Sequence, residues 1–200
     1  WYRNRYQFYA PLYRFAARPL EKGRRRAIER IAPAPGDRIL ILGSGPGLDL
    51  PLLPREASIS ALDAAPTMVR RTKARARELG MDVDARVGDA RNLPHENDSF
   101  DVILLHLILA VVPDPKAVAD EVARVLKPSG RVSIYDKFIP EGTEPSLLRR
   151  ALNPLTRFFF SDITQSLGPI LSETNLEIGA RETVLGGLYT ITSARPRRDN

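Results

Sequence analysis

One short segment limits the fold of this chain more than any other: an apolar run that ends directly in a glycine-rich turn. Residues 39–42 are Ile-Leu-Ile-Leu, and residues 43–47 are Gly-Ser-Gly-Pro-Gly. The apolar run predicts a strand buried on both faces. The glycines allow positive φ and let a ligand approach bare backbone. A buried strand followed by such a turn and a helix is typical of doubly wound α/β folds that bind a nucleotide-like ligand. The spacing G-x-G-x-G differs from the G-x-G-x-x-G dinucleotide fingerprint, so it favours another adenosine ligand over NAD.

Further along the chain, strand-like and helix-like segments follow one another regularly. Strands are expected near residues 38–42, 58–62, 83–87, 101–106 and 131–136, and helices near residues 48–54, 66–79 and 115–126. This alternation predicts a parallel sheet joined by right-handed crossovers. Residues 143–175 are expected to be helical with breaks at their prolines. Residues 176–184 and 188–193 alternate in polarity around Gly186-Gly187, which predicts a closing β-hairpin.

A series of motifs stands in a fixed order over residues 30–140. After the glycine turn come Leu-Asp at residues 62–63, Gly-Asp-Ala at residues 88–90, and Val-Leu-Lys-Pro-Ser-Gly-Arg-Val at residues 125–132. This series resembles the class I S-adenosylmethionine (SAM) dependent methyltransferases. The resemblance implies one α/β domain over residues 1–200, with a Rossmann-like seven-stranded sheet, a C-terminal antiparallel hairpin in an otherwise mostly parallel arrangement, and helices on both faces. It also implies methyl transfer with SAM as cofactor, S-adenosyl-L-homocysteine as product and no metal.

The resemblance also assigns residues to the cofactor. The glycine turn would wrap the methionine part of SAM, Asp63 would bind the ribose, and Asp89 would meet the adenine amino group. The backbone of Ala90 would meet a ring nitrogen, and Ala64 and Met68 would flank the adenine. The predicted cofactor-binding residues are Gly43, Ser44, Gly45, Gly47, Asp63, Ala64, Met68, Asp89, Ala90 and His106.

Two positions depart from the family pattern. Ile41 stands where the family usually has Glu or Asp, and Pro46 stands where Thr or Ser is common. Loss of the acid would weaken contact with the ammonium end of SAM, but it leaves the expected fold unchanged.

His106, Tyr135, Tyr9 and Tyr13 are the candidate catalytic residues. His106 ends the fourth expected strand, at the edge where open α/β sheets bind ligands. Three roles stay open for it: it contacts a ligand, it takes a proton, or it lies at this edge without a chemical role. Tyr135 and Asp136 end the fifth strand, and because strand residues alternate in direction only one can face the cleft. Asp136 would otherwise cap the next segment. Tyr9 and Tyr13 would share a helix face. In related methyltransferases a Tyr-rich N-terminal helix closes over SAM and the acceptor, but here these aromatics could equally just cover the sheet.

The positive charge of the chain is concentrated at its beginning. Residues 1–30 hold nine Lys or Arg against two Glu, whereas the remaining 170 residues hold 21 against 22, which gives the total of +6. Trp, Tyr and Phe are interleaved with these arginines, a composition typical of helices that bind anionic lipid surfaces. Residues 1–31 are therefore expected to form one or two helices, interrupted at Pro11 and Pro19, that act as a lid or membrane contact.

Composition also argues against several classes of protein. The chain has no cysteine, so it has neither disulfides nor a thiolate nucleophile. Its two distant histidines, without acids at ligand spacing, do not predict a metal site. No apolar run reaches the ~20 residues of a spanning helix, and the aromatic, basic start does not resemble a secretory signal peptide. Nucleic-acid binding is disfavoured because the chain outside residues 1–30 is near neutral and carries no base-flipping or RNA-recognition signature.

The methyl acceptor is suggested by the basic arm together with the run His-Leu-Ile-Leu-Ala-Val-Val-Pro-Asp-Pro at residues 106–115. With the turn at residues 125–130, these features resemble bacterial phosphatidylethanolamine N-methyltransferases and the related quinone-biosynthesis methyltransferases. The resemblance implies a cytoplasmic monomer, peripheral on the anionic inner face of the membrane, that methylates a phospholipid amine. Two alternatives stay open: methylation of a soluble small molecule or quinone precursor, and SAM binding without catalysis. Residues 143–175 would then be a helical insertion that selects the substrate or simply packs on the domain.

Overall fold

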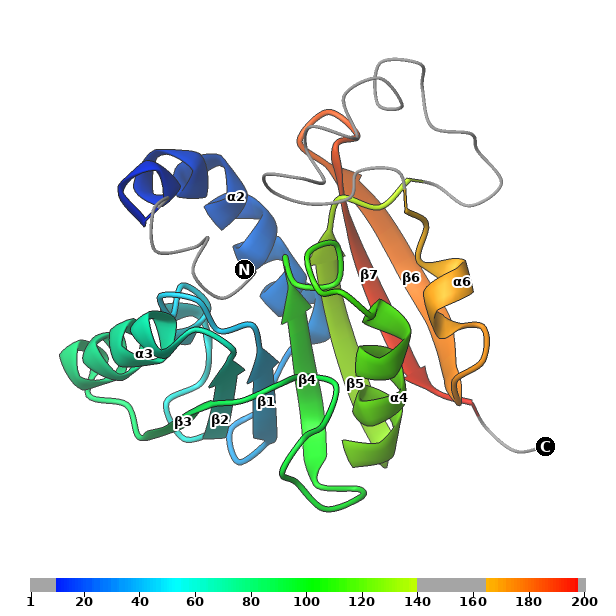
Figure 1. The fold of residues 1–200 in the computed structure, drawn as a ribbon, viewed down its shortest axis with the longest axis horizontal. Coiled ribbons are helices and arrows are strands. Elements are labelled where there is room, and N and C mark those ends of the chain that lie inside the picture. Colours follow the sequence, from blue (N-terminus) through cyan, green and yellow to red (C-terminus); the bar gives the residue numbers. More distant parts are fainter. Residues whose placement is uncertain (1–9, 140–164, 198–200) are drawn as a thin grey trace.

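A seven-stranded sheet forms the centre of the fold (Figure 1). The computed structural model describes residues 10–139 and 165–197, and for residues 10–19 only the course of the backbone is described. The strands stand in the order β3-β2-β1-β4-β5-β7-β6. Their bounds are Arg38–Leu42 (β1), Ser58–Asp63 (β2), Val83–Val87 (β3), Phe100–His106 (β4), Leu126–Asp136 (β5), Leu176–Val184 (β6) and Tyr189–Pro196 (β7).

The pairing of the strands confirms the expected Rossmann-like topology. Strands β1 to β5 pair in parallel, whereas β7 pairs antiparallel with both β5 and β6. The hairpin between β6 and β7 turns at Gly186 and Gly187, which have φ of 65° and 84°. β1 lies between β2 and β4: the chain builds β2 and β3 on one side of β1 and, after β3, crosses to build β4 on the other side. Open α/β sheets bind ligands at such a switch point, beyond the carboxyl ends of the strands.

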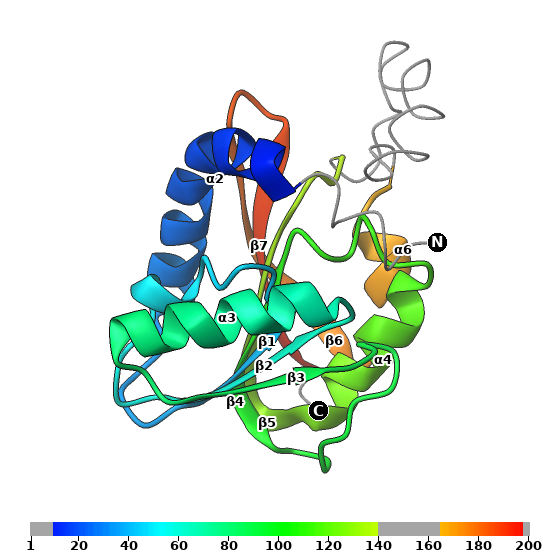
Figure 2. The same ribbon diagram turned by 60° about the vertical axis from the view of Figure 1, so that its left-hand side comes forward.

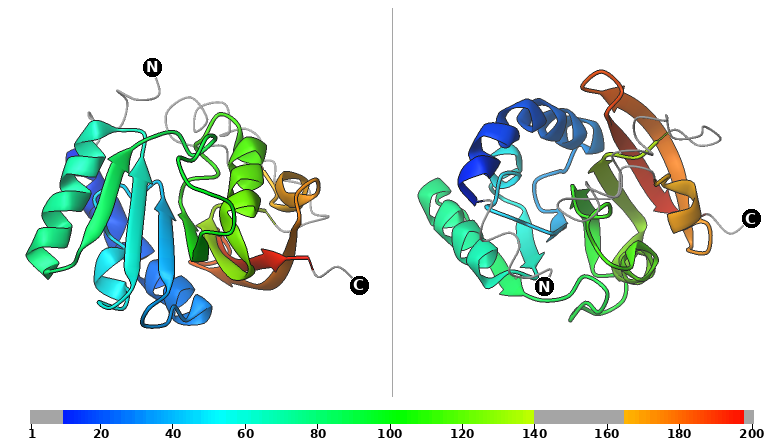
Figure 3. Two further views of the ribbon diagram at one scale, coloured as in Figure 1. Left: turned by 90° about the horizontal axis from the view of Figure 1, so that it is seen from below. Right: turned by 45° about the horizontal axis from the view of Figure 1, so that its top comes forward.

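Helices cover both faces of the sheet, as Figures 2 and 3 show. α2 and α3 lie on one face, and α4 and the short α6 lie on the other. The helix bounds are Ala10–Ile31 (α2), Pro66–Leu79 (α3), Pro115–Val125 (α4) and Gly168–Leu171 (α6). Among the described helices, none is long and apolar enough to cross a membrane.

The continuous apolar run of β1 is explained by this two-sided cover. Alternate side chains of a strand point to opposite faces. Ile39 and Ile41 pack in the core that α3 covers, and Leu40 and Leu42 pack in the core that α4 covers. Burial on both faces is therefore the reason that residues 39–42 of this strand are all apolar.

Local signals fix where the helices on either side begin and end. α3 begins at Pro66, whose missing N–H is not needed in a first helical turn. It ends at Gly80, which takes the left-handed conformation at φ 65°. At the start of α4, the Asp114 carboxylate accepts a hydrogen bond of 3.1 Å from the backbone N–H of Ala117.

α2 differs from the sequence-based expectation, because it is one continuous helix across both prolines. Pro11 lies in the first turn, where an N–H is dispensable. Pro19 lies inside the helix, and Figure 2 shows that α2 changes direction in its N-terminal half. A proline that bends a helix without ending it accounts for this shape. The prediction that Pro19 interrupts the helix was therefore wrong.

α2 is fastened to the sheet through residues of its second half. Gly23 allows the closest approach, since a Cβ at this position would lie 2.3 Å from the hydroxyl of Tyr135 in β5. Further toward the C-terminal end of α2, Arg26 and Arg30 form ion pairs with Glu182 of β6. Arg131 of β5 donates to the carbonyl of Ile31 at 2.7 Å, which satisfies the end of the helix. The second half of α2 is thus held by contacts with β5 and β6.

Two other segments differ from the expected elements. A helix was expected over residues 48–54, but only the single 3-10 turn η1 (Leu50–Leu52) forms there. Prolines 51 and 54 remove the donors that a longer helix would need. The turn expected at residues 127–130 is present as an irregularity within β5, where the pairing with β4 jumps from Leu126 to Arg131.

Candidate functional site

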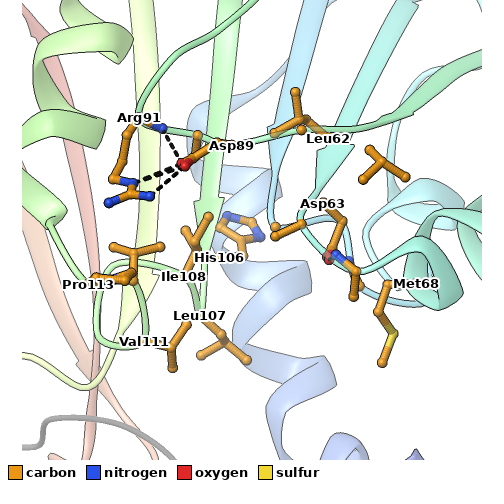
Figure 4. A pocket seen from close by; sticks show the side chains of 18 residues that line it. Leu62, Asp63, Met68, Asp89, Arg91, His106, Leu107, Ile108, Val111 and Pro113 are labelled. Atoms are coloured by element: carbon orange, nitrogen blue, oxygen red, sulfur yellow. Dashed lines mark hydrogen bonds and ion pairs between the residues drawn. The ribbon is translucent and has the colours of Figure 1, made fainter. Parts of the chain in front are cut away.

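A cavity of about 520 Å³ opens at the carboxyl edge of the sheet, where β1, β2 and β4 end (Figure 4). It brings together eight of the ten residues predicted to bind cofactor. These are Gly43, Gly45, Asp63, Ala64, Met68, Asp89, Ala90 and His106. The cavity therefore lies at the switch point of the sheet and collects motifs that are far apart in the sequence.

The glycine turn forms one wall of the cavity. Gly43, Gly45 and Gly47 have φ of 67°, 54° and 76°, a region that other residues rarely adopt. A Cβ on Gly43 would lie 3.0 Å from Cδ1 of Ile108, so the close contact with the opposite wall also requires glycine. A Cβ on Gly45 would meet only a carbonyl 4.0 Å away, which leaves this part of the turn open to a ligand.

Ser44 and Gly47 do not line the cavity. The Ser44 hydroxyl lies 3.0 Å from Oγ1 of Thr72 in α3, behind the turn. Gly47 packs against Leu50 and the side chain of Arg75. These two residues shape the turn and fasten it to α3, and their geometry gives no support for direct contact with a ligand.

Asp63 lies on one side of the cavity, where β2 ends (Figure 4). Its two carboxylate oxygens accept backbone N–H bonds of 2.9 Å from Gly45 and Ala65. Burial raises the pKa of this carboxyl, although both hydrogen bonds act in the opposite direction. Each oxygen keeps further acceptor capacity, because a carboxylate offers about four lone-pair positions. Asp63 can therefore accept hydrogen bonds from a pair of hydroxyls, such as those of a ribose.

Asp89 lies on the other side of the cavity and is paired with Arg91 (Figure 4). The guanidinium donates to both carboxylate oxygens, with the shortest contact at 2.6 Å. These hydrogen bonds lower the pKa of Asp89. Both side chains are about half exposed, so the pair can open at little cost when a ligand needs the carboxylate.

The remaining wall of the cavity is apolar. It is formed by the residues directly after β4: Leu107, Ile108, Val111, Val112 and Pro113. Leu107 has φ of 63°, which is uncommon for a non-glycine residue, and its N–H donates to the carbonyl of Tyr135 at 2.8 Å. This hydrogen bond holds the strained residue at the carboxyl end of β4. Strained backbone conformations of this kind are often found at functional sites.

A chain of four buried polar side chains runs past the cavity. Arg24 of α2 donates to Oδ2 of Asp49 at 2.7 Å, and Oδ1 of Asp49 lies 2.9 Å from Nδ1 of His106. The other ring nitrogen, Nε2, lies 3.0 Å from the hydroxyl of Ser133 in β5. None of the four residues is more than 6% exposed. We refer to them as the buried network.

Charge pairing within the buried network is strong enough to keep Asp49 ionised. Burial alone would raise the pKa of its carboxyl, but Arg24 and His106 together hold it well below its usual range. Among the four members, only His106 also lines the cavity, where it lies between the Asp63 and Asp89 sides in Figure 4. Because both ring nitrogens are occupied by protein groups, the described geometry does not support His106 as a base for a substrate.

Of the three predicted tyrosines, only the side chain of Tyr135 is described, and it does not line the cavity. Tyr135 is fully buried against Ala27 and Ile191 on the α2 side of the sheet, and burial raises the pKa of its hydroxyl. Its expected role as a catalytic residue thus has no support from this geometry. Tyr9 lies outside the described residues. For Tyr13 only the backbone, within α2, is described.

Asp136, the alternative to Tyr135, does not face the cavity either. Its carboxylate accepts backbone N–H bonds from Ala110 at 3.1 Å and from Lys137 at 2.8 Å. Burial raises the pKa of this carboxyl. Asp136 therefore caps the segments that follow β4 and β5. This agrees with the capping role that the sequence offered as the alternative to a place in the cleft.

The lining of the cavity fits an adenosine-type cofactor. The open backbone at Gly45 leaves room for a polar ligand segment. The acceptor oxygens of Asp63 suit a ribose diol, and the exposed carboxylate of Asp89 suits an amino group. Ile41, which replaces the usual acid, is 2% exposed inside an apolar core and offers no charge to the cavity. Within the described residues, no group of three or more His, Asp or Glu side chains could hold a metal ion.

Comparison with known proteins identifies the family. A family model described as a methyltransferase domain matches residues 40–134. A phosphatidylethanolamine N-methyltransferase from Cereibacter sphaeroides is 28% identical over 184 residues, which cover 90% of each chain. The chain belongs to the SAM-dependent methyltransferases. SAM is accordingly the cofactor expected for this site.

Other relatives show how broad this family is. Nocamycin O-methyltransferase from Saccharothrix syringae is 37% identical over 136 residues, but the match covers 66% of this chain and only 47% of that enzyme. Among solved structures, the methyltransferase in complex with the Haloferax volcanii Trm112 methyltransferase activator aligns over 99% of this chain and 98% of that chain, with a TM-score of 0.80 and 18% identity. At this identity the structural likeness shows the fold alone.

Sequence analysis missed two residues that organise the site, Arg24 and Asp49. Neither stands in a motif, and they are 25 residues apart in the chain. Arg24 was counted only as part of the basic arm. The available signal was weak: Gly23 beside it permits close helix packing, and Asp49 is an acid within an otherwise apolar stretch after the glycine turn.

Proposed function

We propose that this methyltransferase transfers methyl groups from SAM to the amine of a phospholipid, phosphatidylethanolamine and its methylated forms, at a membrane surface. The observation that carries the proposal is the similarity to the Cereibacter sphaeroides enzyme, which extends over 90% of both chains. The other curated relative described above matches a smaller part of its own length.

The distribution of charge supports docking of the arm on anionic lipid. Residues 1–30 carry nine basic and two acidic side chains. Within α2, Lys22 and Arg25 are exposed, whereas Arg24 is neutralised by Asp49 and Arg30 by Glu182. Basic residues near an anionic surface each contribute about 1 kcal/mol to attraction. We propose that residues 1–31 act as this membrane contact and that residues 143–175 form an insertion that selects the acceptor.

The tip of the β6–β7 hairpin offers an apolar contact at the same end of the molecule. Leu185 and Leu188 are 36% and 58% exposed, and a Cβ added to either of the two glycines between them would meet no atom within 4 Å. Figures 1 and 2 both place this tip beyond the carboxyl edge of the sheet, and Val184 and Tyr189 on either side of it belong to the same apolar cluster as Leu20 of α2. Exposed leucines next to a basic helix suit the boundary between lipid headgroups and acyl chains.

The described residues suggest how the chain promotes transfer. When bound, SAM supplies a methyl group that is activated for in-line displacement by its positively charged sulfur. The apolar wall after β4 excludes water and holds the acceptor in line. The titratable side chains that line the cavity are Asp63, Asp89, Arg91 and His106, and each already has protein partners. The acceptor amine therefore enters as the free base, without proton removal by these residues.

A lipid methylation assay tests the proposal directly. Purified protein is incubated with SAM and vesicles of phosphatidylethanolamine, with and without phosphatidylglycerol, and mono-, di- and trimethylated lipid is measured by mass spectrometry. We expect methylated lipid, formed faster with the anionic vesicles. Binding of S-adenosylhomocysteine without any methylated lipid would favour a soluble acceptor, as the similarity to an O-methyltransferase allows.

A pair of matched variants tests the membrane contact separately. Arg25→Gln removes an exposed charge from α2, and Arg71→Gln removes an exposed charge from α3, a helix that lies away from the hairpin tip in Figure 1. We expect Arg25→Gln to weaken sedimentation with anionic vesicles and Arg71→Gln to leave it unchanged. Equal effects of the two substitutions would show that total charge, and not the arm, governs binding.

A further inference from the structure

The buried network links three parts of the chain that sequence analysis treats separately. Arg24 comes from the N-terminal helix, Asp49 follows the glycine turn, and His106 and Ser133 belong to neighbouring strands of the sheet. Through Arg24 the helix that carries the basic arm is tied to the segment behind the cofactor turn. Through His106 the same network reaches the surface of the cavity.

The hydrogen bonds of the network restrict the state of His106. Asp49 is ionised, so it accepts a proton from Nδ1. Nε2 then faces the hydroxyl of Ser133, which can donate to it if the ring is neutral. Arg24 and Asp49 cancel in charge, so a neutral imidazole leaves the network without net charge. An imidazolium would leave one uncompensated positive charge inside the protein.

Other groups near His106 do not change this balance. Tyr135 packs edge-on to the imidazole, with ring centroids 6.0 Å apart, and is neutral. Asp136 at the end of β5 is buried, and both of its oxygens are held by backbone N–H groups. Asp49 therefore remains the only carboxylate among the described residues that hydrogen-bonds to the ring.

A neutral His106 suits the charge of the cofactor that is expected in the cavity. SAM carries a sulfonium cation, whereas S-adenosylhomocysteine carries an uncharged thioether. We propose that Arg24 and Asp49 are positioning residues that keep His106 as the neutral, Nδ1-protonated imidazole, so that the cavity wall does not repel a cationic cofactor. The inference rests on the methyltransferase activity of the family and does not depend on a lipid acceptor.

NMR of the histidine ring nitrogens tests the proposal without any catalytic assay. The chain has only two histidines, and His95→Gln assigns the other set of signals to His106. We expect His106 to be neutral with the proton on Nδ1 at pH 7. In Arg24→Met the carboxylate of Asp49 loses its cation and draws a second proton onto the ring, so His106 becomes an imidazolium. An imidazolium or an Nε2-protonated ring in the parent protein would overturn the proposal.

Calorimetric titration with SAM and with S-adenosylhomocysteine supplies the second measurement. Arg24→Met is expected to lower the affinity for SAM about tenfold relative to that for S-adenosylhomocysteine, because a charge in the cavity wall acts on the sulfonium alone. Arg25→Met, a neighbouring exposed arginine, should leave both affinities unchanged. An equal loss for both ligands, with His106 still neutral, would mean that Arg24 only supports the structure.

Two further variants separate charge from packing. Arg24→Met combined with Asp49→Asn removes both charges, and we expect it to restore both the neutral His106 signals and the parental ratio of affinities. Arg24→Lys keeps the cation and should behave like the parent if the single variant fails to fold. A double variant with the same affinity defect as Arg24→Met would contradict the charge argument.

Discussion

Two aspartates near the same sheet edge, Asp63 and Asp49, are held in opposite ways. Asp63 accepts from two uncharged backbone N–H groups and lies on the cavity surface. Asp49 accepts from a guanidinium and an imidazole and is 2% exposed. Burial raises the pKa of Asp63, whereas for Asp49 the charge of Arg24 and the hydrogen bonds from Arg24 and His106 overcome burial and lower the pKa.

The difference distinguishes a carboxylate kept for a ligand from one used by the protein itself. A carboxylate with only neutral donors keeps lone pairs and an unmet electrostatic need, both of which a ligand can satisfy. A carboxylate paired with a buried cation has already gained what a ligand could offer. Asp63 should therefore govern binding, and Asp49 should govern stability and the state of His106.

The largest expected effect is the loss of stability when Asp49 is removed. Asp49→Ala leaves Arg24 buried without this counter-ion, and we expect the free energy of unfolding to fall by about 3–5 kcal/mol. Asp63→Ala removes two backbone contacts near the surface and should cost about 1 kcal/mol. Urea unfolding followed by circular dichroism measures both. A smaller loss for Asp49→Ala than for Asp63→Ala would reverse the comparison.

The second-largest expected effect concerns ligand binding, for which Asp63 should matter more than Asp49. Asp63→Ala should lower the affinity for S-adenosylhomocysteine about 100-fold, since two hydrogen bonds to a charged acceptor are lost. Asp84→Ala, which removes an exposed aspartate from β3, is the control and should bind like the parent. Calorimetry measures both affinities. Unchanged binding by Asp63→Ala would show that this carboxylate does not contact the ligand.

A smaller effect appears in the pH dependence of stability, and its sign differs between the two residues. The pKa of Asp49 is lowered on folding, so its contribution is present above the unfolded value of about 3.9 and is lost as the pH falls below it. The pKa of Asp63 is raised, so its contribution is present below about 3.9 and is lost as the pH rises above it.

Urea titrations of Asp49→Asn and Asp63→Asn between about pH 2 and pH 6 test these signs. The stability of the parent relative to Asp49→Asn should increase with pH in the acid range. Relative to Asp63→Asn it should decrease as the pH rises above about 4. Slopes of the same sign for the two variants would contradict the assigned environments.

The contrast between the two aspartates also explains what sequence analysis could predict. Asp63 and the glycine turn are parts of a local pattern, a buried strand with its following turn, and such patterns fix both the fold and one wall of the cavity. The Asp49 partners are 25 and 57 residues away in the sequence. No local pattern encodes that contact, because it depends on how closely α2 approaches the sheet at Gly23. For the same reason the inward direction of Tyr135 and the continuity of α2 through Pro19 could not be predicted from the sequence.

The smallest expected effect concerns the third carboxylate of the site, Asp89, which is intermediate between the other two. It has a cationic partner like Asp49 but is about half exposed like a surface group. Because exposed ion pairs contribute little, Arg91→Gln should leave the urea midpoint unchanged. The freed carboxylate should instead bind S-adenosylhomocysteine about threefold more tightly, since it no longer exchanges one partner for another. The matched control is Lys116→Gln, which removes the exposed ion pair between Lys116 of α4 and Glu173. Weaker binding by Arg91→Gln would show that the guanidinium itself contacts the ligand, and Asp89 would then resemble Asp49 more than Asp63.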